Sequence, residues 1–208
     1  MEIEREAFPT MWPRTAFQKE LEQNRLARYL VATQVRQVEP ELKLPPEFQD
    51  LQPSYRGLAG FLDGLRSMVA GDEGEELPAP DDREELVVGF IGIWLMVGEA
   101  HIVSIAVRED YRGQHIGELL VIAAISLSLE NGFSRVSLEC RVSNYIALSL
   151  YEKYNFQRVG VRPRYYSDNH EDAYIMVVEG LESPEFQERF RRLQDEHQNR
   201  CGVYELHL

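Results

Sequence analysis

Cysteine and histidine are scarce in this sequence, and neither forms a pattern. The chain has two cysteines, Cys140 and Cys201, without a CxxC pair, and its five histidines lie singly. Isolated thiols argue against a disulfide framework and suit a reducing compartment, so we expect free cysteines and a cytoplasmic location. Scattered histidines do not provide the close ligand spacing of a metal site, so we expect no metal.

Positive charge and long apolar runs are scarce as well. Lys and Arg number 22 against 35 Asp and Glu, which gives a formal net charge of -13. Such a field repels nucleic acid and anionic membranes and favours a cationic partner. The longest apolar run, LLVIAAISLSL, is too short to cross a bilayer. The acidic start, MEIEREAFPT, lacks the basic and then apolar pattern of a signal peptide, so we expect no targeting segment.

The remaining composition is that of an ordinary folded protein, with 44% hydrophobic and 27% charged residues. We expect one domain over residues 1–182 with a surface insertion at 36–86, where prolines and acidic clusters break the periodic pattern. A short amphipathic helix is predicted inside the insertion at 58–70. A Ser-Pro pair predicts a C-terminal helical extension over 183–208 that packs back on the domain.

Hydrophobic periodicity predicts the other helices and strands. Helices are expected at 14–28, 115–131 and 145–154, and strands at 29–35, 86–97, 99–110, 135–142, 157–164 and 173–178. Gly98 joins two of these strands in a hairpin. Asn131 and Gly132 provide a left-handed end for the second helix.

The segment YRGQHIGELL (111–120) lacks a capping residue. A helix is predicted to begin near His115, yet no Ser, Thr, Asp or Asn stands there to accept bonds from its first NH groups. These NH groups and the helix dipole, with Arg112 and Gly113 in the turn ahead, form an anion site suited to a phosphate. The segment lacks the Lys-Ser/Thr of a nucleotide P-loop and the three glycines of a dinucleotide fingerprint. The alternative is an exposed turn ahead of a core helix.

Two polar side chains further along are candidates for proton transfer. Strand alternation in RVSLECRV places Glu139 on the face opposite the apolar one. The apolar face carries Val136, Leu138, Cys140 and Val142, and the opposite face carries Ser137, Glu139 and Arg141. Tyr151 is predicted beside an apolar helical stripe, so that its hydroxyl reaches the edge of the packed face. That stripe consists of Ile146, Leu150 and Tyr154. The alternatives are a solvated surface glutamate and a packed tyrosine with an exposed tip.

The order of these segments resembles the GCN5-related N-acetyltransferase (GNAT) superfamily, and within it the RimI-type ribosomal-protein-alanine N-acetyltransferases. The resemblance is dense over residues 86–180 and loose over 5–35. IVSIAVREDYRGQHIGELL resembles the family's pyrophosphate segment, Arg/Gln-x-x-Gly-x-Gly/Ala. LECRVSNYIALSLYEKYNF resembles its Leu-Glu-Val-Arg-x-Ser-Asn to Leu-Tyr-x-x-x-Gly-Phe block. RPRYYSDNHEDAYIM resembles the Arg-Tyr-Tyr segment ahead of the last core strand.

The resemblance implies an α/β GNAT fold with a mixed, mostly antiparallel sheet flanked by helices. The sheet would splay between the strand ending near Arg108 and the strand bearing Glu139, and acetyl-coenzyme A (acetyl-CoA) would insert there. Glu139 would be the general base, through water, and Tyr151 the coenzyme-contacting acid that protonates the departing thiolate. Tyr165 and Tyr166 would wall the acceptor site. The implied pyrophosphate residues are Arg112, Gly113, Gln114, His115, Ile116, Gly117 and Glu118, and the implied pantetheine residues are Ile105, Ala106, Val107 and Asn144.

The implied reaction is acetyl transfer to an amine, which needs proton removal from nitrogen, stabilisation of an oxyanion and a proton for sulfur. An α-amine with a pKa of about 8 is easier to deprotonate than a lysine at about 10.4, by about 3 kcal/mol. We therefore expect a protein N-terminal amine as acceptor. The resemblance implies the N-terminal alanine of a small-subunit ribosomal protein, whose basic N-terminal peptide would be attracted by the acidic surface. The alternatives are a small amine or a lysine as acceptor, and a module that binds acyl-CoA or a protein partner without catalysis. No oligomeric state is predicted.

Several features depart from the family pattern. His115 stands where the family usually has glycine, and its side chain would crowd the phosphates unless it turns outward or donates to them. Asn155 replaces a glycine ahead of Phe156, and asparagine tolerates a left-handed helix end. The family's first strand has no counterpart, so we expect either a misassigned start or a sheet without that edge. The insertion at 36–86 either covers the acceptor groove or is a solvated loop.

Overall fold

A computed structural model of the chain describes residues 14–37, 83–202 and 204–208. The chain divides into two compact units, one formed by residues 1–34 with 86–208 and the other by residues 35–85. Of the second unit, only the strand ends at 35–37 and 83–85 lie within the described residues, and the predicted helix at 58–70 lies outside them. The division into a domain and a C-terminal extension at residue 183 remains a prediction.

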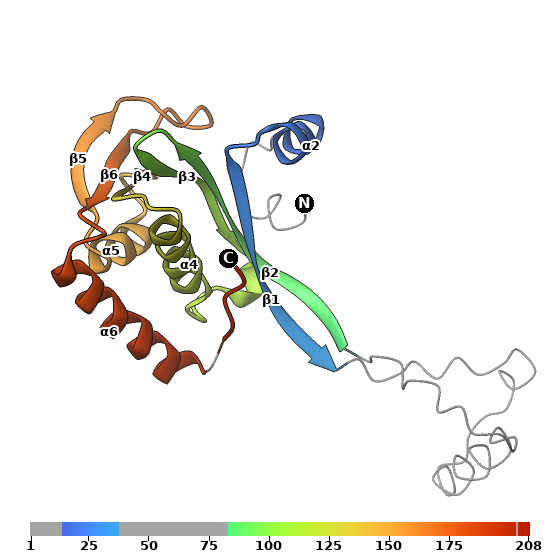
Figure 1. The fold of residues 1–208 in the computed structure, drawn as a ribbon. Helices are drawn as coiled ribbons and strands as arrows, with labels where there is room; N and C mark the ends of the chain where they lie inside the picture. Colours follow the sequence, from blue (N-terminus) through green and yellow to red (C-terminus); the bar gives the residue numbers. More distant parts are fainter. Residues whose placement is uncertain (1–13, 38–82, 203) are drawn as a thin grey trace, which may run out of the picture. The chain divides into compact units, whose positions relative to one another are not determined.

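Six strands form one sheet in the order β1-β2-β3-β4-β6-β5 (Figure 1). They are β1 (Ala27–Gln37), β2 (Arg83–Met96), β3 (Glu99–Val107), β4 (Arg135–Arg141), β5 (Gln157–Arg162) and β6 (Ala173–Glu179). β2 with β3, β4 with β6 and β5 with β6 pair antiparallel, whereas β3 and β4 run parallel. This arrangement confirms the predicted mixed, mostly antiparallel sheet.

Helices flank the sheet. They are α2 (Arg14–Gln23), the short 3-10 helix η2 (Glu109–Tyr111), α4 (Ile116–Glu130), α5 (Tyr145–Lys153) and α6 (Pro184–Cys201). α4 packs on β3 and β4 and also against α6, so it lies between the sheet and α6 (Figure 1). Because it is covered on both sides, α4 is apolar around most of its circumference. No helix within the described ranges is long and apolar enough to cross a membrane.

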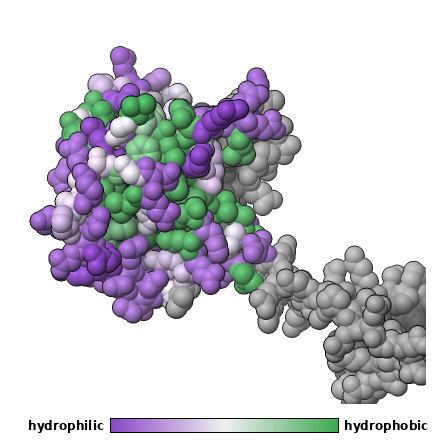
Figure 2. Space-filling view, in the orientation of Figure 1, coloured by the Kyte–Doolittle hydropathy of each residue, from purple (hydrophilic) through white to green (hydrophobic). Residues whose placement is uncertain are grey.

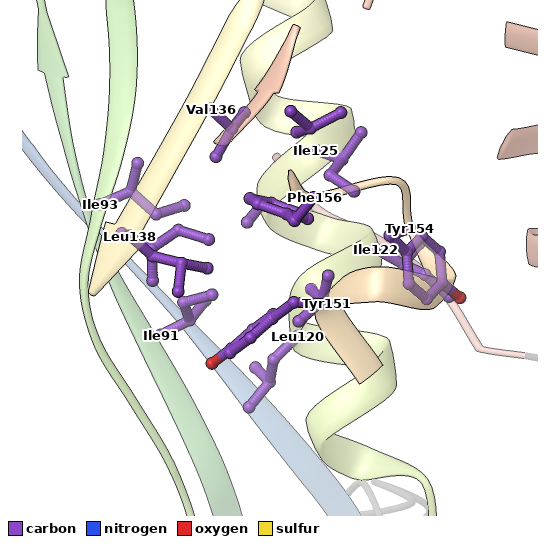
Figure 3. Packing of buried hydrophobic residues seen from close by; sticks show 14 of the residues in the cluster. Ile91, Ile93, Leu120, Ile122, Ile125, Val136, Leu138, Tyr151, Tyr154 and Phe156 are labelled. Carbon is purple, nitrogen blue, oxygen red and sulfur yellow. The ribbon is translucent and has the colours of Figure 1, made fainter. Parts of the chain in front are cut away.

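The hydrophobic core joins the sheet to α4 and α5 (Figure 3). Ile91 from β2, Leu138 from β4 and Ile125 from α4 are almost wholly buried there. Burial of a side chain of this size stabilises the fold by roughly 1.5–3 kcal/mol. α6 is amphipathic: Phe186 and Phe190 are buried, while the space-filling view shows mainly hydrophilic side chains over its outer side (Figure 2).

The elements predicted within the described residues are present, some with shifted ends. The helix predicted to reach residue 28 ends at Gln23, and β1 begins at Ala27. The strand predicted to reach residue 110 ends at Val107, where the turn ahead of α4 begins. Gly98, with φ 88, joins β2 and β3 in the predicted hairpin, and Asn155, with φ 69, takes the left-handed conformation expected after α5.

The predicted apolar stripe of α5 is wrong at Ile146, whose side chain is 87% exposed. Leu148 and Tyr151 are buried instead. A row of residues spaced four apart drifts around a helix of 3.6 residues per turn. The row that starts at Ile146 on the solvent side therefore passes through the partly buried Leu150 and is buried only at Tyr154.

Candidate active site

The sheet opens between β3 and β4. Their parallel pairing joins residues 100–102 to residues 136–138 and stops there. Beyond this point β3 remains paired to β2 and β4 to β6, so within the described sheet the edges that face each other carry unmatched backbone groups. Backbone NH and CO groups need hydrogen-bond partners, so an extended ligand can form hydrogen bonds with such edges as an added strand would.

The turn ahead of α4 lies beside the end of β3. Its backbone is left-handed at Gly113, with φ 77, and again at His115, with φ 61. No side chain caps the first turn of α4, as the sequence predicts. Nor does the His115 side chain cap the helix: its Nδ1 lies 3.3 Å from Oε2 of Glu118, so the ring turns back onto the helix. The first turn therefore offers its NH groups to an anion.

Two side chains connect this turn to its surroundings. Nε of Arg112 donates to the carbonyl of Val107 at 3.4 Å, which links the arginine to the last residue of β3. Nε2 of Gln114 donates to the carbonyl of Asp110 at 3.2 Å. Arg112 is exposed, so its positive charge stands beside the uncapped helix start.

A close approach between β2 and α4 holds the helix start near the opening. A Cβ atom at Gly89 would lie 3.0 Å from the carbonyl oxygen of Ala106 and 3.2 Å from side-chain atoms of Ile116 and Leu120. Glycine at this position lets the first turn of α4 pack directly on the two strands. Sequence reasoning missed Gly89, because nothing in the sequence around a strand glycine indicates which residues pack against it.

Glu139 is the first residue of β4 beyond its pairing with β3, and its carboxylate has two cationic or donor neighbours. Its carboxylate is 6% exposed, with Oε2 3.2 Å from Nε2 of His101 and Oε1 2.8 Å from Nε of Arg162. Nδ1 of His101 lies 2.8 Å from the hydroxyl of Ser137. If Nε2 of a neutral His101 donates to Glu139, Nδ1 accepts from the Ser137 hydroxyl, so both ring nitrogens are engaged.

These contacts set the protonation state of Glu139. The hydrogen bond from His101 lowers the pKa of the carboxyl most, and the Arg162 guanidinium lowers it further against the opposing effect of burial. Glu139 is therefore ionised at neutral pH. Sequence reasoning missed His101 and Arg162, because the pairing of His101 with Ser137 across the two parallel strands is visible only in the structure.

Tyr151 lies in the core with its hydroxyl toward the sheet (Figure 3). The residue is 4% exposed, and its ring packs against that of Phe156 at a centroid distance of 5.7 Å. Burial raises the pKa of the phenol well above its usual value, with further contributions from Cys140 and Tyr166. A phenol with a raised pKa stays protonated at neutral pH and can act only as a proton donor there.

Tyr165 and Tyr166 follow β5 and lie near both candidates. Their rings are perpendicular, with centroids 5.2 Å apart. Burial raises the pKa of each tyrosine, and the charge of Glu139 adds to both shifts. Arg162, which contacts the Glu139 carboxylate at 2.8 Å, also lies 5.7 Å from the ring centroid of Tyr165, so the structure places the predicted base close to the predicted acceptor-site residues.

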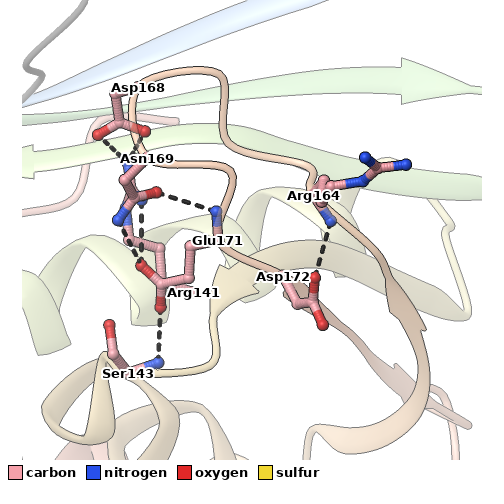
Figure 4. A network of polar contacts seen from close by, with 7 residues as sticks. All are labelled: Arg141, Ser143, Arg164, Asp168, Asn169, Glu171 and Asp172. Atoms are coloured by element: carbon pink, nitrogen blue, oxygen red, sulfur yellow. Dashed lines mark hydrogen bonds and ion pairs between the residues drawn. The ribbon is translucent and has the colours of Figure 1, made fainter.

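A polar network holds the segment that carries these tyrosines (Figure 4). Arg141 lies 3.7 Å from the ring centroid of Tyr166 and donates to both carboxylate oxygens of Asp168 at 2.9 Å. It also donates to Glu171 at 3.2 Å, and Glu171 accepts from the backbone NH of Ser143 at 2.9 Å. The network joins the end of β4 to the loop between β5 and β6, a role for Arg141 that strand alternation alone does not predict.

The remaining predicted residues lie at the end of β3, at the start of α5 and in the first turn of α4. Ile105 to Val107 lie in the half of β3 that pairs with β2 but not with β4, so their edge facing β4 is unpaired within the described sheet. Asn144 is the N-cap of α5 and accepts from the NH of Ala147 at 3.2 Å, which leaves its amide nitrogen for a ligand. The carboxylate of Glu118 is buried beneath the first turn of α4, so only its backbone NH belongs to the anion site. Across the described residues, no cluster of His, Cys, Asp or Glu has the grouping of a metal site.

Comparison with known proteins identifies relatives of this arrangement. The profile of the acetyltransferase (GNAT) family matches residues 36–156. A putative ribosomal protein bS18-alanine N-acetyltransferase of Bacillus subtilis is 44% identical over 97 residues, which are 47% of this chain and 64% of that protein. An N-alpha-acetyltransferase of Saccharolobus solfataricus is 47% identical over 84 residues, which are 39% of this chain and 49% of that protein. The chain thus spans less than two thirds of the length of either relative.

A solved structure shares the fold. The crystal structure of the ribosomal-protein-S18-alanine N-acetyltransferase from Escherichia coli matches with a TM-score of 0.56, over 86% of this chain and 84% of that one. The two sequences are 22% identical over the match, so the likeness concerns the fold.

Proposed function

Because the chain belongs to the GNAT acetyltransferase family, we propose that it transfers an acetyl group from acetyl-CoA to a protein N-terminal α-amine. The observation that carries this proposal is the end of the β3–β4 pairing directly ahead of Glu139. The ionised carboxylate of Glu139 lies where β3 and β4 separate. The edges of the two strands that face each other there carry backbone NH and CO groups without partners in the described sheet.

The residues around the opening fit acetyl-CoA, which supplies an activated acetyl thioester when bound. The NH groups from Gly113 to Glu118 and the Arg112 guanidinium would hold the pyrophosphate, because the helix start is uncapped and positively polarised. The unpaired edge at Ile105 to Val107 would bond the pantetheine arm, and the amide nitrogen of Asn144 would add a donor. The His115 ring lies against Glu118, with Nδ1 3.3 Å from Oε2, and this orientation would reduce the predicted crowding of the phosphates.

Glu139 would accept the proton of the acceptor amine, through water. With its pKa held below the usual value, it is a weak base, so the reaction depends on the fraction of amine that is already neutral. At pH 7 about one tenth of an α-amine with a pKa of about 8 is neutral, against about one in 2,500 of a lysine. A weak base of this kind therefore favours an α-amine over a lysine.

Tyr151 would protonate the departing thiolate. Its raised pKa keeps the proton available across the physiological range, and its hydroxyl points toward the sheet rather than toward α6 (Figure 3). A positioned acid of this type contributes about 10²–10⁴-fold to a rate.

The proposed acceptor is the N-terminal alanine of a small-subunit ribosomal protein. The names of relatives that act on bS18 or on N-terminal α-amines support this choice. Tyr165 and Tyr166 would wall the acceptor site, and the net charge of -13 favours a basic peptide. We also infer a cytoplasmic location, because ribosomal proteins are made there and because Cys140 and Cys201 are both free.

A panel of acceptors tests the proposal. The chain is incubated with acetyl-CoA and a basic peptide with N-terminal alanine, the same peptide with a blocked N-terminus and one lysine, or a small polyamine. Acetylation of the first peptide alone is expected. Turnover of only the lysine or the polyamine would change the acceptor class, and coenzyme binding without turnover of any acceptor would indicate a non-catalytic module.

The variants Glu139→Gln and Tyr151→Phe then test the assigned roles. Each should lose most of kcat while still binding coenzyme A. Rates equal to the wild type in both variants would contradict the catalytic assignment.

A further inference from the structure

α6 reaches the turn ahead of α4 through one buried histidine. His197 is 2% exposed, and its Nε2 lies 3.1 Å from the backbone carbonyl oxygen of His115. A carbonyl can only accept, so Nε2 carries the proton and donates. Nδ1 of His197 is buried and has no hydrogen-bond partner among the described residues. The bond to His115 is therefore the polar contact that fixes the ring of His197 in its pocket.

The backbone that receives this bond is in an unusual conformation. His115 has φ 61 and ψ 12, in the left-handed region that disfavours residues other than glycine. Its carbonyl also accepts from the NH of Leu119 at 3.0 Å, the first bond of α4. His197 thus supplies a second donor to the peptide group at which the chain turns into the helix. Such conformations persist where the surrounding structure determines them from several directions.

A second contact of α6 acts on the same turn. The Glu118 carboxylate is buried, and burial opposes its charge, but hydrogen bonds from Lys153 and Tyr154 hold its pKa below the usual value. The Tyr154 hydroxyl donates at 2.9 Å, and Arg200 from α6 places a guanidinium nitrogen 3.7 Å from the other carboxylate oxygen. The negative charge beneath the helix start is thereby balanced, so it opposes an anion at that start less strongly.

We infer that His197 is a positioning residue of the coenzyme site: it holds the His115 peptide so that the NH groups of residues 113–118 face the pyrophosphate. The inference rests on the proposed function for what binds at this turn. It gives α6 a part in the site through its contact with the His115 carbonyl. A left-handed residue other than glycine at position 115 then requires the support that His197 provides.

The test compares variants of the full chain in coenzyme A binding by calorimetry and in steady-state kinetics. His197→Ala should raise the Kd for coenzyme A and the KM for acetyl-CoA about three- to tenfold, the loss expected for one hydrogen bond. kcat at saturating acetyl-CoA and the KM for the acceptor peptide should change little. His197→Gln should recover much of the affinity, because its amide nitrogen can donate to the same carbonyl.

Two further variants separate positioning from general docking of α6. Gln194→Ala is the matched control, since Gln194 contacts Ser126 of α4 at 3.5 Å, away from the turn, and it should keep wild-type affinity. In a His115→Gly background, His197→Ala should cost less affinity than in the wild type, because glycine adopts the left-handed conformation without support. Amide hydrogen exchange of residues 113–119 should speed up in His197→Ala and stay unchanged in Gln194→Ala.

Several results would overturn the inference. One is a folded His197→Ala variant that binds coenzyme A as the wild type does. Another is an equal affinity loss in Gln194→Ala, which would assign the effect to docking of the whole helix. If the wild type itself binds no coenzyme A, the proposed function is wrong, and hydrogen exchange alone then reports whether His197 holds the turn.

Discussion

Replacement of Tyr151 by phenylalanine should separate catalysis from stability. The ring of Tyr151 packs on Phe156 in the core, and phenylalanine keeps that packing. Its hydroxyl makes no hydrogen bond to a described residue. The substitution therefore removes one proton donor and leaves the rest of the structure as it is.

The two expected effects differ by a wide margin. A lost general acid lowers kcat by about 10²–10⁴-fold, which is about 2.7–5.4 kcal/mol of transition-state stabilisation at 1.36 kcal/mol per factor of ten. Loss of a hydroxyl without a protein partner should change the free energy of unfolding by less than about 1 kcal/mol.

Tyr154→Phe is the matched control on the same segment. Tyr154 is 1% exposed, and its hydroxyl points away from that of Tyr151 (Figure 3) and donates to the Glu118 carboxylate at 2.9 Å. Loss of a hydrogen bond to a charged group costs about 1.5–3 kcal/mol. In a chain of this size that should lower Tm by about 3–12 °C, while kcat at saturating acetyl-CoA is largely kept.

The assay measures kcat and Tm for both variants beside the wild type. Tyr151→Phe should lose kcat and keep Tm, and Tyr154→Phe should show the reverse. A Tyr151→Phe variant with wild-type kcat, or one whose activity falls only in proportion to its folded fraction, would refute the assignment of Tyr151 as the acid.

Three further predictions concern charge and pH. The lowered pKa of Glu139 keeps it ionised, and burial keeps Tyr151 protonated. kcat/KM for an N-terminal peptide should therefore rise with the neutral fraction of the acceptor amine to about pH 8 and then level off. A rise that continues to about pH 10.4 would indicate a lysine acceptor. Arg141→Lys keeps the charge but cannot contact Asp168 and Glu171 through two separate nitrogens, as the guanidinium does, so KM for the acceptor peptide should rise while the Kd for coenzyme A stays constant. An equal change in both would contradict the local role of the network. Hydrogen bonds from the Ser143 hydroxyl and NH lower the pKa of Glu171 to about 2, below its ordinary 4.5. The contribution of Glu171 to stability is therefore present above pH 4.5 and lost as pH falls toward 2, so Glu171→Gln should flatten the acid unfolding curve in that window. An unchanged curve would argue against these bonds.

The order of helices and strands could be predicted from the sequence because each element carries its own period. Alternation in β4 placed Glu139 on the polar face, and the missing cap at His115 identified the uncapped helix start that the structure shows. These are local properties, decided by residues that are neighbours in the chain.

The partners of those residues depend on contacts between distant segments. His101 reaches Glu139 only because β3 and β4 pair in one particular register, and Arg162 reaches it from the far strand β5. His197 meets His115 because α6 folds back along α4. The error at Ile146 has a local origin instead, because residues spaced four apart drift around a helix of 3.6 residues per turn and the row chosen from the sequence begins on the solvent side.

The most direct measurement of the central claim is a mass-spectrometric time course with acetyl-CoA and a basic peptide that begins with alanine. One acetyl group should appear on the N-terminal amine, at a rate that Glu139→Gln lowers by about 10²–10⁴-fold. A protein that binds the coenzyme but leaves this amine unmodified, or a Glu139→Gln variant that modifies it at the wild-type rate, would contradict the account.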